Sequence, residues 1–192
     1  MKLQILIPTL PERKESFDSL VAVLRNQTIA AGYEWGKDVW YLAEYTARGL
    51  MTIGEKRNRL LEIADADYVA FHDDDDSPSA TYILRTMEGI NKGVDACSLR
   101  GVITWDGINP EIFEHSIKYP EWKTNSTGEI KYERNTNHLN VIKREIAQQF
   151  KFPETNFGED HDWSQQLHAS GLIKTEHFID EVIYNYQFVS RK

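Results

Sequence analysis

Four consecutive aspartates, Asp73 to Asp76, are the residues of this chain best suited to chemistry. They directly follow residues 68–71, a short apolar run that is typical of a buried strand. Two carboxylates about 4 Å apart repel each other by roughly 1 kcal/mol in water and by about 4 kcal/mol at an effective dielectric constant of 20. Such a run therefore needs a divalent cation, basic neighbours or full solvation. Oxygen ligands of this kind suit Mg²⁺ or Mn²⁺, which take a few carboxylates together with substrate phosphates.

Two other interpretations of the aspartate run need to be weighed. Most charge runs are solvated turns, and this alternative stays open, although a place at the end of a strand favours a ligand site. A calcium-binding helix–loop–helix does not fit. Counted from Asp73, its sixth residue is Pro78 instead of glycine and its twelfth is Leu84 instead of glutamate.

A basic segment, residues 54–59, opens a predicted helix in which Leu60 and Leu61 point toward the core. Lys56 and Arg59 are three residues apart and share a helix face. Cations near a helix N-terminus oppose the macrodipole by roughly 0.3–1 kcal/mol each. A bound diphosphate would explain their presence better than folding alone. An exposed basic helix face is the alternative.

A third candidate segment, residues 156–163, places Asp160 at the start of another predicted helix. Asp160, Trp163 and Leu167 recur at i, i+3 and i+7, so the carboxylate shares a face with two residues that seek the core. A carboxylate held beside an aromatic ring is partly desolvated and has a raised pKa, as a general base requires. The alternative is helix-start chemistry, because acidic residues stabilise a first turn without any catalytic role.

The elements that must position these segments alternate along the chain. Strands are predicted at 3–7, 39–43, 68–71 and 96–105, and helices around 17–24, 54–64 and 79–91. This alternation predicts a mostly parallel sheet with helices on both faces. Residues 106–136 lose periodicity, and we interpret them as an irregular excursion that forms an acceptor loop. Order returns at 138–142, in helices around 145–150 and 160–169, and in a closing strand at 179–189.

Composition restricts the class of protein. A length of 192 residues fits one domain, and 41% hydrophobic with 27% charged residues argues against disorder. A net charge of −8 disfavours non-specific binding to nucleic acids or anionic membranes. The single cysteine, Cys97, cannot form an internal disulfide and is expected to be a small buried hydrophobe. No apolar stretch approaches the ~20 residues that span a bilayer, so we expect a cytoplasmic protein without membrane insertion.

Together, these segments resemble the inverting glycosyltransferases of the GT-A fold, the family-2-like group, over nearly the whole chain. Four segments carry the resemblance in order: Ile7-Pro-Thr-Leu-Pro-Glu-Arg13 for a nucleotide-contacting loop, Gly54-Glu-Lys-Arg57-Asn58 for Gly-x-x-Arg-Asn, Asp73-Asp-Asp75 for Asp-x-Asp, and Gly158-Glu-Asp160-His-Asp-Trp163 for Gly-Glu-Asp-x-x-Trp. The resemblance implies an α/β fold, a three-layer α/β/α sandwich with a mostly parallel central sheet. It also implies a single domain over residues 1–192, with a nucleotide-binding half at 1–104 and an acceptor-binding half at 105–192.

The resemblance further implies an activity and roles for the matched residues. Such an enzyme moves a sugar from a nucleotide-diphosphate sugar to an acceptor hydroxyl, and needs Mn²⁺ or Mg²⁺ as a Lewis acid on the leaving diphosphate. Asp160 would deprotonate the acceptor, and Asp73 and Asp75 would hold the ribose and the metal ion. The expected nucleotide-sugar-binding residues are Pro8, Thr9, Arg13, Lys56, Arg57, Asn58, Asp73 and Asp74. UDP-sugars are the commonest donors of this family, so a UDP-sugar is expected here; the acceptor stays open.

Several assignments stay open at this stage. The aspartate run is longer than the motif, so Asp74 and Asp76 form an alternative register, and Asp162 is an alternative base. His138 and His177 are candidates for a late metal ligand, although a satisfied or exposed histidine is the simpler interpretation of each. Three aromatic residues border the excursion and would either stack on a substrate or form a satellite core, namely Trp105, Tyr119 and Trp122.

Two alternative functions also stay open. A metal-dependent nucleotidyltransferase uses the same residue types but releases pyrophosphate instead of a nucleoside diphosphate. A non-catalytic nucleotide-sugar-binding module would keep the fold without the base. Kinase-like ATPases, dinucleotide-binding enzymes and serine hydrolases have no support, because their glycine-rich and nucleophile motifs do not occur in the sequence.

Overall fold

The computed structural model describes residues 1–189. No helix in this part of the chain is long and apolar enough to cross a bilayer. The elements follow the order β1 (Leu3–Pro8), the short 3-10 helix η1 (Pro11–Arg13), α1 (Lys14–Ala30), β2 (Val39–Glu44), α2 (Ile53–Ile63), β3 (Tyr68–Phe71), β4 (Ser77–Pro78), α3 (Tyr82–Ile90), β5 (Ala96–Cys97), β6 (Leu99–Trp105), β7 (Ile108–His115), β8 (Lys123–Thr124), β9 (Ile130–Arg134), β10 (Ile142–Lys143), α4 (Arg144–Ala147), α5 (Glu159–Ser170), β11 (Glu176–His177) and β12 (Val182–Phe188).

The first sheet has the strand order β11-β5-β10-β3-β1-β2. Strand β1 pairs in parallel with β2 and β3, and β5 pairs in parallel with β11, whereas β10 is antiparallel to both of its neighbours. Every residue of β1 is buried, as is typical of a parallel strand covered on both faces. The sheet is therefore mostly parallel, as the alternation of strands and helices predicts.

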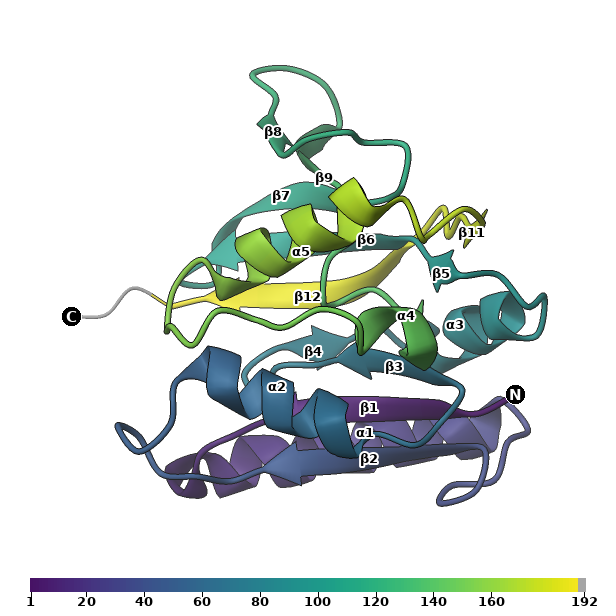
Figure 1. Ribbon diagram of the computed structural model, residues 1–192, viewed down its shortest axis with the longest axis vertical. Coiled ribbons are helices and arrows are strands. Elements are labelled where there is room, and N and C mark those ends of the chain that lie inside the picture. Colours follow the sequence, from purple (N-terminus) through teal and green to yellow (C-terminus); the bar gives the residue numbers. More distant parts are fainter. Residues whose placement is uncertain (190–192) are drawn as a thin grey trace.

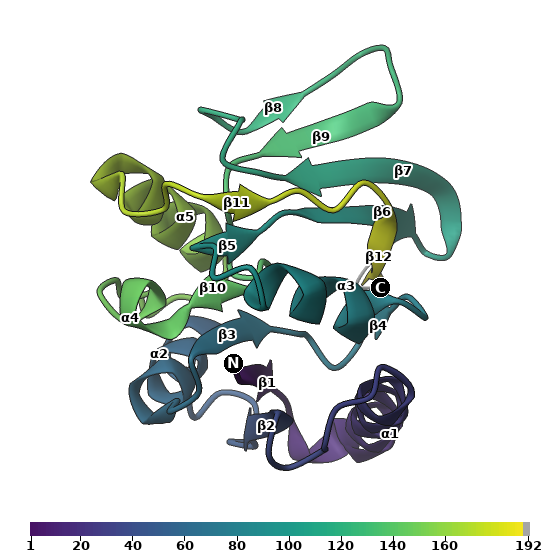
Figure 2. The ribbon, with the colours of Figure 1, turned by 90° about the vertical axis from the view of Figure 1, so that its right-hand side faces the viewer.

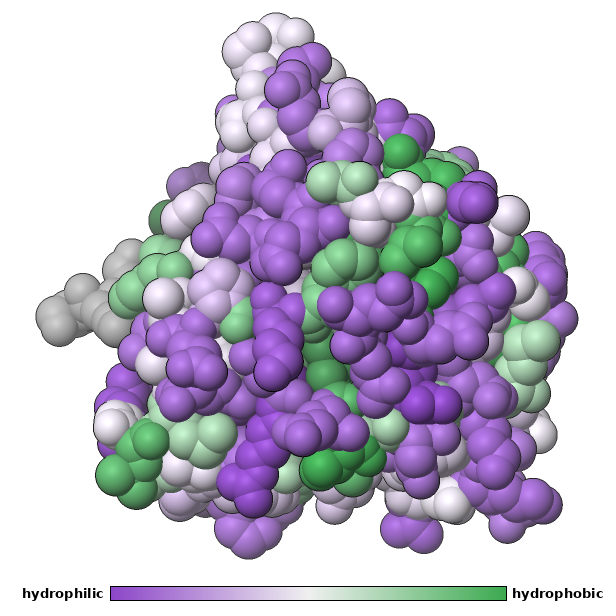
Figure 3. Space-filling model, viewed as in Figure 1, coloured by the Kyte–Doolittle hydropathy of each residue, from purple (hydrophilic) through white to green (hydrophobic). Residues whose placement is uncertain are grey.

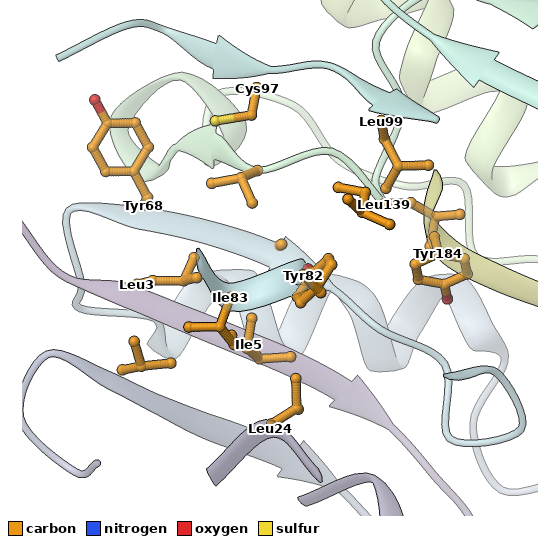
Figure 4. Packing of buried hydrophobic residues seen from close by; sticks show 14 of the residues in the cluster. Leu3, Ile5, Leu24, Tyr68, Tyr82, Ile83, Cys97, Leu99, Leu139 and Tyr184 are labelled. Carbon is orange, nitrogen blue, oxygen red and sulfur yellow. The ribbon is translucent and has the colours of Figure 1, made fainter. Parts of the chain in front are cut away.

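Helices cover both faces of this sheet, with α2, α4 and α5 on one side and α1 and α3 on the other (Figure 2). Side chains alternate along β1, so its two faces belong to two apolar cores. Leu3 and Ile5 pack toward α1 and α3, beside Leu24 and Ile83 (Figure 4), whereas Leu6 packs toward α2 and α5. Cys97 is a buried free thiol in the first core, as expected, and burial raises its pKa to about 12.

A second sheet, with the order β4-β12-β6-β7-β9-β8, stands beside the first (Figure 1). Strand β12 connects the body of this sheet to the aspartate run, because β12 pairs with β6 and with the short strand β4 that follows the run. Tyr184 of β12 packs toward Tyr82 of α3 and Leu139 (Figure 4). The second sheet thereby covers the apolar core that contains Leu3 and Ile5.

The expectation of an irregular excursion at 106–136 is wrong, because β7, β8 and β9 lie within it. Strands β6 and β7 form a hairpin around Asp106 and Gly107, which both have positive φ values (52° and 80°). Asp-Gly is a strong signal for a two-residue hairpin turn. The signal was present in the sequence. The strand pattern after it was weak, because β7 carries Pro110 and is exposed over its first three residues.

The single strand expected at 96–105 is in fact two strands, one in each sheet. Strand β5 pairs with β10 and β11, and β6 pairs with β7 and β12. Ser98 lies at the crossing, where its N–H donates to His177 O (3.0 Å) and its Oγ accepts from Ile179 N (2.7 Å). A continuous apolar run gives no sign of such a change of sheet, because both strands are buried.

Candidate active site

The predicted site residues meet at the carboxyl ends of β1, β2 and β3, where open α/β sheets bind ligands. Thr9 follows β1, Glu44 ends β2 and Asp73 follows β3. The carboxyl end of β12 reaches the same side of the molecule (left in Figure 1). The face that carries α2 and α5 is largely hydrophilic (Figure 3).

Two of the four aspartates are buried and held by protein groups. Asp74 accepts from Thr9 Oγ1 (2.5 Å) and from Arg13 Nη1 (2.7 Å), which ties the loop after β1 to the aspartate run. Asp76 accepts from Tyr184 OH (2.7 Å) and from Gln187 N (2.8 Å), which ties the run to β12. Burial and the charge of Asp73 hold the pKa of Asp76 well above its usual range. These two carboxylates therefore hold the aspartate run in its conformation.

The other two aspartates are more open. The side chain of Asp75 is 49% exposed and contacts Arg13 Nη1 at 2.8 Å, and that of Asp73 is 24% exposed and faces Arg57. Partial burial and the neighbouring charge of Asp73 raise the pKa of Asp75. Negative charge therefore accumulates where the run opens to solvent.

Arg57 joins the aspartate run to α5. Its buried guanidinium donates to Glu159 Oε1 (2.5 Å) and to both oxygens of Asp73 (3.2 Å each), and it lies over the rings of Phe71 and Phe152. Burial raises the pKa of Glu159, although the charge of Arg57 opposes this shift. Arg57 and Glu159 are 102 positions apart in the sequence, so this contact brings the basic segment, the aspartate run and the acidic segment into one site.

Asp160 lies in the first turn of α5 and is half-buried. Its negative charge raises the pKa of Arg57. It also acts on Arg134: burial lowers the pKa of Arg134, and the charge of Asp160 opposes this shift. Trp163 is buried, as expected, and stacks on Phe152 with 4.9 Å between ring centroids. Asp162, the alternative base, lies on the outer side of α5 with its side chain 64% exposed.

Trp122 lies close to this part of α5. Its ring contacts His161 edge-on (4.8 Å between centroids), and the guanidinium of Arg134 lies 4.8 Å from it. Its Nε1 donates to Asn135 Oδ1 at 2.7 Å. Of the three aromatic residues singled out in the sequence, Trp122 is the one with a ring contact to α5 among residues 1–189. Trp105 stacks on Phe188, and Tyr119 donates to Glu114 Oε1.

Lys56 lies beneath the site and not on an exposed basic face. Its Nζ donates to Thr9 O and Thr46 O (2.5 Å each), so it ties the loop after β1 to the loop after β2. Burial lowers its pKa.

Glu44 was missed in the sequence. It accepts from Thr46 N and forms an ion pair with Arg59, and these contacts lower its pKa despite its burial. Its position at the end of a predicted strand was the available signal.

The N-terminus of α2 is occupied, contrary to the expected diphosphate site. Thr52 and Glu55 form a capping box, Ile53 N donates to Asn156 Oδ1 (3.1 Å), and Gly54 N donates to Thr155 O (3.2 Å). The loop before α5 therefore satisfies the free N–H groups that an anion would need. The capping box is local, whereas the pairing of Ile53 N and Gly54 N depends on the tertiary contact between the two segments.

Replacing Gly54 by alanine should separate these two segments. A Cβ at this position would meet Pro153 O at 1.8 Å, so α2 or the 153–156 loop must shift. We expect a loss of about 1–3 kcal/mol in the free energy of unfolding, measured by urea denaturation. Asn26→Ala, at an exposed position of α1, is the control and should not destabilise the protein. A Gly54→Ala protein as stable as the wild type would contradict the close approach.

The remaining predicted residues lie around this centre or away from it. Pro8 ends β1 beside Glu44. The amide of Asn58 pairs at both ends with the main chain of Phe152, so Asn58 holds the segment before α5 and does not face the aspartates. His138 is buried against Phe71 and Phe152. His177 lies on β11, at the sheet edge farthest from β2.

The open carboxylates can hold a metal ion only with help from a substrate. Within residues 1–189, no group of three or more His, Cys, Asp or Glu side chains is arranged to bind a metal. Mg²⁺ and Mn²⁺ at nucleotide sites, however, use one or two carboxylates and complete their shell with phosphate oxygens and water. Asp73 and Asp75 fit that smaller requirement.

Comparison with protein-family models and with curated proteins gives no match. Among solved structures, the chain is similar to S. aureus TarS 1–349, with a TM-score of 0.67 and 16% identity over 97% of this chain and 60% of that one. The same protein in complex with UDP-GlcNAc gives a TM-score of 0.65 at 16% identity, over 100% and 59% of the two chains. Its complex with UDP gives 0.64 at 14% identity, over 97% and 60%.

The chain thus spans about 60% of the length of these TarS structures. At this level of identity, the similarity establishes the fold. It confirms the mixed α/β, GT-A-like fold that the sequence resemblance implies.

Proposed function

We propose that this protein is an inverting glycosyltransferase that moves a sugar from a UDP-sugar to an acceptor hydroxyl. The observation that carries the proposal is the buried guanidinium of Arg57, which holds Asp73 of the aspartate run beside Glu159 and thus beside Asp160. A group that binds a leaving diphosphate and a base must flank the same reacting carbon. The TarS structures that contain UDP and UDP-GlcNAc support a uridine diphosphate donor.

The donor would lie along the carboxyl ends of β1 to β3, in the half formed by residues 1–104. Thr9 and Arg13 are held by the buried carboxylate of Asp74 and border this edge. Lys56 fixes the loops beneath them. The acceptor would approach from the half formed by residues 105–192, along Trp122 and Arg134, which lie next to the first turn of α5.

Asp73 and Asp75 would hold the Mn²⁺ or Mg²⁺ ion, because their side chains are partly exposed beside Arg57 and Arg13, whereas Asp74 and Asp76 are buried and bonded to protein groups. This supports the register that the sequence resemblance implies over the alternative pair. The bound ion would supply positive charge to the leaving diphosphate.

Asp160 would accept the proton of the acceptor hydroxyl while that oxygen bonds to the anomeric carbon and the carbon–oxygen bond to the diphosphate breaks. One displacement of this kind inverts the configuration at carbon and needs no covalent sugar–enzyme intermediate. Glu159 does not suit this task, since it is buried and paired with Arg57. Asp162 suits it poorly, because its side chain lies on the exposed side of α5.

UDP binding should depend on a divalent cation. In calorimetric titrations, we expect UDP to bind at least tenfold more tightly with Mn²⁺ than with EDTA, which corresponds to 1.4 kcal/mol. Asp75→Asn should abolish this gain, because it removes a charged oxygen ligand. Glu62→Gln, which neutralises an exposed carboxylate at the other end of α2, should retain it. Binding that is equal with Mn²⁺ and with EDTA would contradict the metal assignment.

Product analysis distinguishes the proposal from nucleotidyl transfer. Incubation with a UDP-sugar and Mn²⁺ should release UDP, whereas a nucleotidyltransferase forms or consumes pyrophosphate. Release of pyrophosphate from a nucleoside triphosphate would replace the proposed function with that alternative.

A further inference from the structure

Tyr186 lies on β12 between two residues that hold the aspartate run. The hydroxyl of Tyr184 donates to Asp76 Oδ2 (2.7 Å), and the main-chain N–H of Gln187 donates to Asp76 Oδ1 (2.8 Å). Side chains at i and i+2 of a strand share a face, so Tyr186 faces the same side of the second sheet as Tyr184. It lies two residues closer to the carboxyl end of β12, on the side of the molecule where the site opens. The contacts of β12 thereby place a second phenol beside the aspartates.

Within residues 1–189, the hydroxyl of Tyr186 is unpaired, unlike that of Tyr184. Tyr184 is fully buried and paired with Asp76. Tyr186 is half-buried, and its hydroxyl has no hydrogen-bond partner within residues 1–189 and is not among the buried unpaired atoms, so it reaches solvent. Burial and four carboxylates raise its pKa to about 12. The group therefore stays protonated at neutral pH and can donate a hydrogen bond.

The carboxylates that act on Tyr186 come from both sides of the site. Three belong to the aspartate run, Asp73, Asp75 and Asp76, and the fourth is Asp160. In a single displacement, the leaving group and the nucleophile lie on opposite faces of the anomeric carbon. Tyr186 is therefore within electrostatic reach of both the proposed diphosphate-binding residues and the proposed base.

We propose that the Tyr186 hydroxyl donates a hydrogen bond to a ring hydroxyl of the transferred sugar and helps to select that sugar. This inference rests on the function proposed above. The four carboxylates that act on Tyr186 only accept hydrogen bonds when ionised. A neutral phenol complements them, because it donates to a sugar oxygen while that sugar hydroxyl donates to a carboxylate. Tyr186 was not distinguished in the sequence, where it reads as one aromatic residue of a closing strand.

Tyr186→Phe tests this contact, because it removes the hydroxyl and keeps the ring. The probes are UDP and the UDP-sugar that the wild type hydrolyses fastest among UDP-GlcNAc, UDP-glucose and UDP-galactose, all with Mn²⁺. The affinity for UDP should stay within twofold, while kcat/KM for UDP-sugar hydrolysis falls about 3- to 10-fold, as expected for one lost hydrogen bond. The melting temperature should not change.

Tyr33→Phe is the matched control, since the Tyr33 hydroxyl accepts from Asn91 Nδ2 (2.8 Å) away from the site. It should leave both UDP binding and UDP-sugar hydrolysis unchanged. An unchanged kcat/KM in Tyr186→Phe, or an equal loss of affinity for UDP and UDP-sugar, would overturn the sugar contact alone. Wild-type protein that binds neither UDP nor any of the three UDP-sugars would overturn the proposed function and this inference with it.

Discussion

Asp160→Asn is expected to lower the turnover of a UDP-sugar by about 10²- to 10⁴-fold while UDP still binds. Asparagine has the shape of aspartate but cannot accept a proton, and general-base catalysis contributes this range. Asp160 is half-buried beside Arg57 and Arg134, so the substitution also removes one negative charge from the site. The measurement is UDP release from a UDP-sugar with Mn²⁺, together with the affinity for UDP from calorimetry.

Asp162→Asn is the matched control for this experiment. It makes the same chemical change two residues later, on a side chain that is 64% exposed and contacts only its neighbour His161 among residues 1–189. We expect turnover within about twofold of the wild type. If Asp162→Asn lost activity while Asp160→Asn kept it, the base assignment would move to Asp162. Binding of UDP without turnover in the wild type and both variants would instead favour a non-catalytic nucleotide-sugar-binding module.

Arg57→Met is expected to destabilise the fold by about 3–5 kcal/mol at neutral pH, the usual cost of removing one partner of a buried ion pair. The substitution retains an apolar stem between Phe71 and Phe152 but leaves Glu159 and Asp73 without their cation. Urea denaturation measures the change in the free energy of unfolding. A loss below 1 kcal/mol would show that the guanidinium is not the link between the aspartate run and α5.

The pH dependence of Arg57→Met provides a second check. Burial already raises the pKa of Glu159, and loss of the arginine removes the charge that opposes this shift. A carboxyl whose pKa is higher in the folded than in the unfolded state binds its proton more tightly when folded. The variant should therefore regain part of the lost stability as the pH falls from 7.5 to 5.5. Arg57→Met with Glu159→Gln should recover part of it at pH 7.5, because no buried charge is then left unpaired at position 159.

Local patterns in the sequence were sufficient to identify the three parallel strands β1, β2 and β3 of the first sheet and the three candidate segments. Residues 3–7 and 68–71 form buried strands, and 39–43 form a half-buried strand at the sheet edge, as apolar runs of this length predict. The helix that begins near Asp160 is present as α5, with Trp163 buried on its inner face. The hairpin at Asp106 and Gly107 was also predictable, since its turn signal depends on two adjacent residues.

Other features depend on partners that lie far away in the chain. The α2 N-terminus carries free N–H groups in isolation, and only the docking of Thr155 and Asn156 shows that they are already paired. Lys56 looks like an exposed cation until the main-chain carbonyls of Thr9 and Thr46 surround it. Spacing along a helix cannot reveal such contacts, because it specifies a face and not what covers that face.

The amino-acid sequence alone determined which residue types meet the carboxyl ends of the strands, because strand length and side-chain alternation are local properties. Tertiary structure alone decided which of the four aspartates are buried and bonded to protein groups and which are partly exposed. Asp74 and Asp76 are buried and bonded to groups from the loop after β1 and from β12, while Asp73 and Asp75 remain partly open. The free energy of a carboxylate depends on the groups that surround it in space, and those groups come from positions 9 to 187 of the chain.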